Sequence, residues 1–152
     1  METEHQVVVQ APVDRLFAVV TDYARYPDFL PEVQAVSVHN KGDGVALVHF
    51  DLQLIVRLTF TLRLLEDFPT QVSWSLSQGK MIEQNSGSWR LEPLGAGQSR
   101  ATYALRLRLG GLIPTSVSTR LLGAELPRML GRFADRAQSD APAAAPRKKR
   151  VS

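Results

Sequence analysis

The chain has 152 residues, of which 44% are hydrophobic and 22% charged, a balance typical of one globular domain rather than of a disordered chain. It contains no cysteine, which excludes disulfide bonds, thiolate metal sites, cysteine nucleophiles and thiol redox chemistry. The formal net charge is +3, but four basic residues lie at 147–150, so residues 1–146 hold 14 basic against 15 acidic residues and give little support for a nucleic-acid-binding body.

The beginning of the chain predicts a strand followed by two short helices. Three consecutive valines favour a strand over 3–10. Pro12 can stand in the first turn of a helix, where its missing N–H costs nothing, and apolar residues at three- and four-residue spacing continue this helix to about Val20. A further short helical turn is predicted over 22–26, because the prolines at 27 and 31 prevent a longer one.

From residue 33 onward, apolar residues recur at every second position. This period predicts consecutive antiparallel strands, each with one buried face. The predicted strands are 33–39, 45–52, 54–64, 71–77, 85–92 and 101–109, separated by turn-forming residues that include 40–44, 68–70 and 93–97. The segment 78–82 is predicted to be a loop or a short extension, with Met81 and Ile82 exposed.

Residues 115–138 carry the long helical pattern of the chain, an apolar stripe at three- and four-residue spacing. Such a helix would be about 36 Å long at roughly 1.5 Å per residue. Pro127 lies inside it and is expected to kink it, because proline has no N–H to continue the helical hydrogen bonds. Residues 140–152 show no period and predict a disordered alanine- and proline-containing linker with a basic tail.

The order of these elements predicts an α+β fold. A curved antiparallel sheet of about seven strands would wrap around the long C-terminal helix, with two short helices after the first strand. We expect residues 1–139 to form this domain and residues 140–152 to lie outside it. A curved sheet gripping a helix encloses space at its open end.

The sequence also resembles a known family. Residues 11–17 (APVDRLF) and 22–31 (DYARYPDFLP) are similar to the N-terminal signature of the polyketide cyclase/dehydrase branch of the START-like (SRPBCC, helix-grip) superfamily. The segments 87–91 (GSWRL) and 111–114 (GLIP) continue this resemblance, which covers about 3–139. The most similar groups are the coenzyme-Q-binding START-domain proteins and the bacterial ribosome-association toxins. The resemblance implies a hydrophobic tunnel between sheet and helix, and it implies no cofactor for the members that bind ligands.

The alternation places many large side chains on the concave face of the predicted sheet. They either fill a closed core or line a cavity, and a helix-grip fold favours the cavity. The predicted cavity residues are Phe29, Phe50, Phe60, Leu62, Trp74, Leu76, Asn85, Trp89, Tyr103, Leu105, Val117, Leu121, Leu122 and Met129. Among the polar residues, Asn85 and Gln78 are expected to point inward, to bond a strand end or water or to orient a ligand. The predicted cavity mouth consists of Met81, Ile82, Leu112 and Ile113.

No catalytic or metal-binding set emerges from the remaining residues. His5, His39 and His49 are predicted to be solvated strand residues, and Glu83 is predicted to lie at the rim. We therefore predict no metal, no cofactor and no assigned catalytic residue.

The predicted function is binding of a hydrophobic small molecule, a lipid, an isoprenoid quinone or a polyketide-like compound, as carrier or chaperone. Two alternatives stay open: a polyketide cyclase, aromatase or dehydratase that uses the same cavity, and a ribosome-interacting regulator. The net charge of residues 1–146 argues against a nucleic-acid or ribosome partner.

The acidic residues 1–5 predict no signal peptide, and no apolar stretch is long enough to span a membrane. We expect a cytoplasmic protein, with peripheral contact to the inner face of the membrane or to a partner protein as an alternative. The tail 147–150 could add weak attraction to anionic lipid, or could contact RNA.

Overall fold

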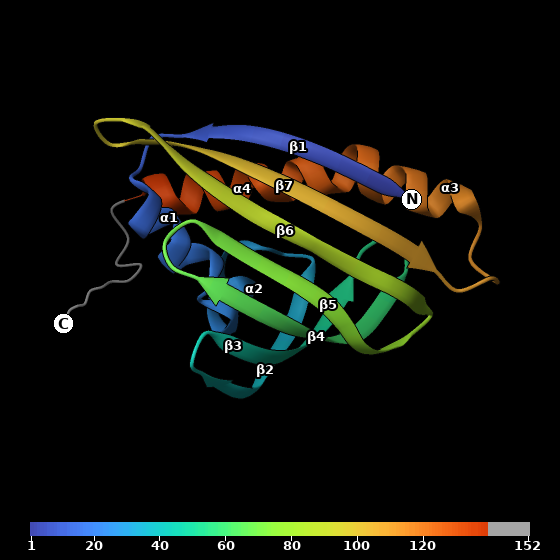
Figure 1. The fold of residues 1–152 in the computed structure, drawn as a ribbon. Helices are drawn as coiled ribbons and strands as arrows, with labels where there is room; N and C mark the ends of the chain where they lie inside the picture. Colours follow the sequence, from blue (N-terminus) through green and yellow to red (C-terminus); the bar gives the residue numbers. More distant parts are fainter. Residues whose placement is uncertain (140–152) are drawn as a thin grey trace.

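The computed structural model describes residues 1–139, which form a seven-stranded antiparallel sheet and a C-terminal helical segment that packs on it (Figure 1). The strand order is β1-β7-β6-β5-β4-β3-β2. The strands are β1 (Glu2–Val9), β2 (Val33–Gly42), β3 (Val45–Gln53), β4 (Arg57–Asp67), β5 (Gln71–Lys80), β6 (Ile82–Gly95) and β7 (Gln98–Leu109). The α+β helix-grip prediction is confirmed, whereas the predicted linker and tail at 140–152 lie outside the described residues.

The helices cover the concave side and one end of the sheet. The N-terminal ones are α1 (Val13–Val20), the 3-10 turn η1 (Tyr23–Arg25) and α2 (Tyr26–Phe29). The C-terminal ones are α3 (Thr115–Arg120), the π-helical segment η2 (Leu121–Glu125) and α4 (Leu126–Gln138). In Figure 1, α4 runs along β7 and β1, and its contacts with α1 and α2 place these short helices at one end of the sheet.

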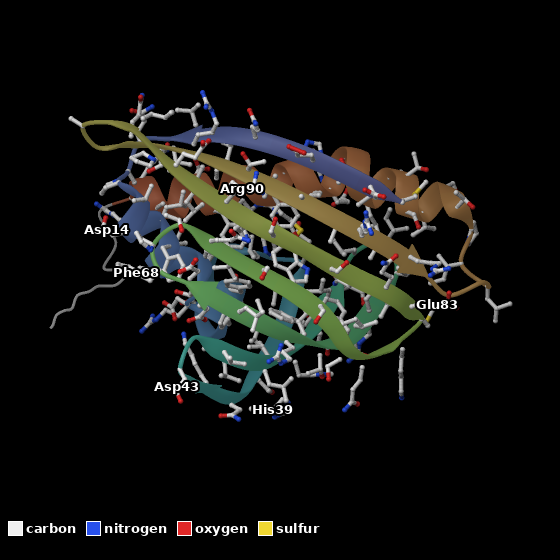
Figure 2. The ribbon with its side chains drawn as sticks, viewed as in Figure 1. Asp14, His39, Asp43, Phe68, Glu83 and Arg90 are labelled. Atoms are coloured by element: carbon white, nitrogen blue, oxygen red, sulfur yellow. The ribbon has the colours of Figure 1, made fainter. Side chains whose placement is uncertain are left out.

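Alternating burial along the strands follows the predicted faces. In β3, for example, Ala46, Val48 and Phe50 are buried, while the intervening residues are partly exposed. These inward side chains meet the apolar stripe of α4, so the core lies between the sheet and the helix. By contrast, His39 and Phe68 lie on the outer surface (Figure 2).

The segment 78–82 continues the neighbouring strands, the second of the two predicted alternatives, but Ile82 is buried where exposure was expected. Strand β5 continues through Lys80, and β6 begins at Ile82 after a tight turn in which Met81 has a φ of +63°. The side chain of Ile82 is 4% exposed and occupies the space beside Gly79, where a Cβ atom would lie 2.4 Å from Ile82 Cγ2. The missing side chain of Gly79 therefore lets Ile82 turn inward. Gln78, expected to point inward, is exposed, because a register shift interrupts the β4–β5 pairing next to it.

Pro127 is accompanied by the π-helical segment η2, which interrupts the C-terminal helix. The N–H of Leu126 donates to the carbonyl of Leu121, five residues back, and Pro127 has no N–H to donate to the preceding turn. His5 Nε2, from β1, lies 3.2 Å from the carbonyl oxygen of Leu122 and can satisfy that acceptor. The prediction that His5 is a solvated strand residue is therefore wrong, because it is partly buried and contacts the irregular helical turn.

Candidate functional site

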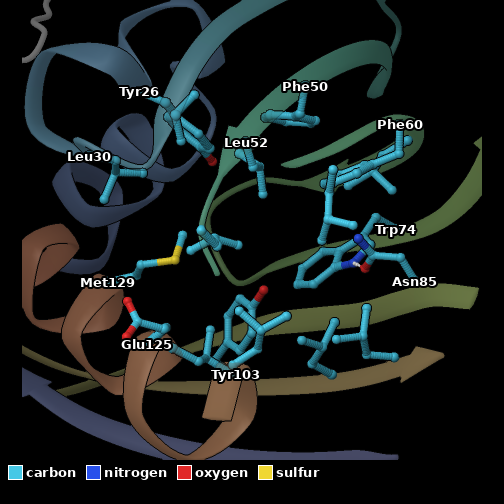
Figure 3. Close-up of a pocket in the computed structure, with 18 of the residues that line it drawn as sticks. Tyr26, Leu30, Phe50, Leu52, Phe60, Trp74, Asn85, Tyr103, Glu125 and Met129 are labelled. Carbon is cyan, nitrogen blue, oxygen red and sulfur yellow. Dashed lines mark hydrogen bonds between the residues drawn. The ribbon is translucent and has the colours of Figure 1, made fainter. Parts of the chain in front are cut away.

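A cavity of about 150 Å³ lies between the concave face of the sheet and the C-terminal helix (Figure 3). Its lining is mostly aliphatic and aromatic, as expected where inward strand positions face an apolar helix stripe. The predicted residues that line it are Phe50, Phe60, Leu62, Trp74, Asn85, Trp89, Tyr103, Leu105, Leu121, Leu122 and Met129. The structure brings these residues together around one space, and their contact with a ligand stays a prediction.

Three predicted cavity residues do not line this space. The ring of Phe29 packs on Phe133 at 5.2 Å between centroids and lies under the guanidinium of Arg136, so it supports the aromatic cluster behind the cavity wall. Leu76 is partly buried and lies against Gly79 near the end of β5. Val117 is partly buried on α3, before the helix reaches the cavity.

The structure also adds lining residues that the sequence reasoning missed. Leu52 and Phe133 belong to faces that the periodicity had marked as buried, so this signal could have identified them. Leu54 also begins the alternating face predicted for 54–64. Tyr26, in α2, and Leu30, just before β2, are marked by no periodic pattern. Further additions are Val20, Tyr23, Val33, Leu58, Leu64, Val72, Ile82, Leu107, Glu125 and Leu126.

Polar groups of the cavity cluster around Trp74. Its indole Nε1 donates to Asn85 Oδ1 at 3.0 Å, and its ring lies 5.3 Å from the ring of Tyr103 (Figure 3). The ring of Tyr103 also meets that of Trp89 edge-on at 4.9 Å. Burial raises the pKa of the Tyr103 hydroxyl above its usual value, so this group stays protonated at neutral pH.

Two further tyrosines of the lining use their hydroxyls within the protein. Tyr23 donates to Glu66 Oε2 at 2.6 Å, and burial together with this hydrogen bond raises the pKa of Tyr23. Tyr26 donates to the carbonyl oxygen of Val20, and burial raises its pKa as well. Both side chains therefore fix the short N-terminal helices against the sheet and have no free proton for a ligand.

A second, outer pocket lies next to the cavity. Leu54 and Glu125 line both spaces and are partly exposed, and Glu32 and Arg120 help to form the outer pocket. These two side chains therefore stand between the cavity and the outer pocket, at the β3–β4 connection and η2.

The predicted mouth residues have other positions. Ile82 lines the cavity itself, and Met81 and Leu112 are exposed. The side chain of Ile113 is partly buried and packs against the core. Their loops instead contact each other, because the N–H of Gly110 donates to the carbonyl of Met81 at 2.9 Å. Glu83, predicted at the rim, is exposed and pairs with Arg108 at 3.8 Å.

An ion pair joins the two ends of the β3–β4 connection, which carries Leu54. Arg57 Nε and Nη2 donate to the two carboxylate oxygens of Asp51 at 3.0 and 2.7 Å. These hydrogen bonds lower the pKa of Asp51, so the pair is intact at neutral pH and is lost as the pH falls through that lowered value.

We expect Asp51→Asn to loosen the β3–β4 connection without unfolding the domain, because one acceptor of the bidentate pair becomes an amide. At neutral pH the amide protons of residues 54–57 should exchange faster, as measured by hydrogen exchange. Asp43→Asn is the matched control, since Asp43 lies in the exposed β2–β3 turn (Figure 2). Equal exchange rates of these amide protons in both variants would show that the Asp51–Arg57 pair does not stabilise the β3–β4 connection.

Residues 1–139 lack the features of a metal site and of a membrane-spanning helix. No three histidine, aspartate or glutamate side chains of this part of the chain gather closely enough to hold a metal ion. Within the same residues, no helix has both the length and the apolar character needed to cross a membrane.

The chain is similar to known proteins in family and in fold. A family model described as polyketide cyclase/dehydrase and lipid transport matches residues 9–134. The aromatase/cyclase Zhui from Streptomyces sp. R1128 superposes with a TM-score of 0.76 at 22% identity, over 90% of this chain and 93% of that one. No curated protein matches the sequence.

Two other solved structures share the fold at lower identity. A START superfamily protein from Mycobacterium smegmatis has a TM-score of 0.77 at 17% identity, covering 90% of this chain and 96% of that one. A STAR-related lipid transfer protein from Xanthomonas axonopodis has a TM-score of 0.74 at 16% identity, covering 91% and 86%.

Proposed function

Because the chain belongs to the polyketide cyclase/dehydrase and lipid transport family, we propose that it binds a hydrophobic small molecule in the cavity between sheet and helix, as a carrier or chaperone. Lipids, isoprenoid quinones such as coenzyme Q, and polyketide-like compounds are the ligand classes this proposal covers. The observation that carries it is the cavity itself, which is lined almost wholly by apolar and aromatic side chains.

The energetics of such a site favour uptake of apolar molecules. Apolar cavities of about this size stay dry and take up ring-sized apolar molecules. Each square ångström of apolar surface removed from water contributes about 25 cal/mol. A longer ligand could reach past Leu54 and Glu125 toward the outer pocket that these residues also line.

The charged groups of the lining favour binding over acid–base catalysis. Glu125 is the single charged side chain among the lining residues, all of which lie within 1–139, and its carboxylate pairs with Arg128 at 3.1 Å. Tyr103 remains protonated at neutral pH because of its raised pKa, so it can donate a hydrogen bond but is a poor base.

Filling the cavity tests this proposal. We expect Leu105→Trp to abolish binding of an apolar probe, because Leu105 lines the cavity and the larger indole would occupy it. The measurement is native mass spectrometry with organic extraction of the protein, together with thermal stabilisation by added apolar probes. Leu65→Trp is the control, since Leu65 is 42% exposed on the outer face of β4. A wild-type protein that binds no apolar molecule, or a Leu105 variant that binds as well as the control, would contradict the proposal.

A further inference from the structure

Asn85 lines the cavity, and its amide has hydrogen-bond donors that no residue of 1–139 uses. Asn85 is only 8% exposed, and its Oδ1 accepts from Trp74 Nε1 at 3.0 Å. Because an indole nitrogen can only donate, this contact fixes the orientation of the amide and leaves the Nδ2 donors free. Among the described residues the unpartnered buried side-chain atom is Glu32 Oε1, so Nδ2 is not fully enclosed by protein and stays accessible.

Tyr103 offers a second donor on the other side of Trp74. Its ring is held by Trp74 and Trp89, and Figure 3 shows its hydroxyl pointing into the cavity. Unlike Tyr23 and Tyr26, it has no hydrogen-bond acceptor among the described residues. Its raised pKa keeps the proton on the oxygen at neutral pH.

The charged groups that line the cavity favour neutral over anionic ligands. Among the lining residues there is no lysine, arginine or histidine, and the one charged group, Glu125, is negative. A carboxylate placed here would lose its hydration without gaining a cation, which is strongly unfavourable. A neutral oxygen such as that of a ketone requires only donors.

We propose that the ligand carries a neutral carbonyl-type oxygen that accepts a hydrogen bond from the Tyr103 hydroxyl, and that the Asn85 amide serves a second neutral acceptor of a larger ligand. Carboxylates are selected against. This inference rests on the proposed function, because it assigns a ligand class to the same cavity. It explains why two donors stand unpaired in a space that is otherwise apolar.

The test compares three probes of similar shape: ethylbenzene, acetophenone and benzoate. Their dissociation constants are measured by calorimetry or NMR titration at neutral pH, with wild-type protein and with Tyr103→Phe. We expect the variant to bind acetophenone about threefold to tenfold more weakly, which corresponds to one lost neutral hydrogen bond. Ethylbenzene should bind both proteins equally, and benzoate should bind neither.

Tyr26→Phe is the matched control for the loss of a hydroxyl. Tyr26 also lines the cavity, but its hydroxyl already donates to the carbonyl of Val20, so its removal should not change the preference for acetophenone over ethylbenzene. Equal losses for acetophenone and ethylbenzene in the Tyr103 variant, or tight binding of benzoate, would overturn the inference while leaving the proposed function intact. If wild-type protein bound none of the three, the proposed function would fail as well.

Discussion

Replacing Phe133 with alanine is expected to destabilise the domain by about 3–5 kcal/mol, the usual cost of deleting a buried phenylalanine ring. Phe133 is 5% exposed and packs between α4, the short helix α2 and the sheet. Its ring centroid lies 5.2 Å from that of Tyr26 and 5.0 Å from that of Trp89. A single substitution thus removes contacts between the C-terminal helix, α2 and β6.

The loss would be measured by urea unfolding of the wild-type protein and the variant. Small domains have a free energy of unfolding of about 5–15 kcal/mol, so a loss of this size would bring the Phe133 variant near the limit of stable folding. Phe68→Ala is the control, because Phe68 is 67% exposed and makes one edge-on contact with Phe17. Similar losses in the two variants would show that the aromatic cluster does not hold the helix on the sheet.

Gly87→Ala is expected to cost about 3 kcal/mol, at the upper end of the usual range for overpacking. A Cβ atom at Gly87 would lie 2.1 Å from the carbonyl oxygen of Ala104 and 2.7 Å from Trp74 Cζ2. The carbonyl belongs to the neighbouring strand and cannot move without disturbing the β6–β7 pairing. The indole of Trp74 therefore lies where it does because position 87 has no side chain.

Thermal or urea unfolding measures the loss of stability in the Gly87→Ala variant. The near-ultraviolet circular dichroism of the tryptophans reports the displacement of Trp74. The control is Gly131→Ala, at which a Cβ atom would meet nothing within 4 Å. Gly131 lies inside α4, so alanine there should stabilise the protein by about 0.5–1 kcal/mol. A Gly87 variant as stable as wild type would contradict the close packing of Trp74 on β6.

Much of the sheet could be predicted because its signal is local. Alternation of side chains depends only on neighbouring residues, so the inward faces of β3, β4 and β7 were readable from the sequence. The apolar stripe of the C-terminal helix has the same local origin, and the family resemblance joined these elements into one fold. The predicted cavity residues on these faces accordingly lie around one space.

The outer pocket beside the cavity and the irregular helix could not be predicted in the same way. Leu54 and Glu125 lie far apart in the sequence, and only the folded chain places both between the cavity and the outer pocket. Pro127 indicated an interruption of the helix, but its π-helical form and the contact with His5 depend on where β1 docks. The contact of Trp74 with Asn85 depends on the register of β5 and β6, which alternation alone does not determine.

The position of β1 has a kinetic consequence. Glu2 pairs with Arg106 and Val9 with Ser99, so the first strand of the sheet finds its partner only in the last one. Contacts between such distant residues require closure of a long loop before they give any stabilisation, and domains rich in them fold in milliseconds to seconds. During synthesis, β1 and the His5 side chain that meets η2 must wait until β7 has left the ribosome. The cavity wall is also completed late, because β7 and the C-terminal helical segment contribute lining residues, so a partly synthesised chain has no finished site for a ligand.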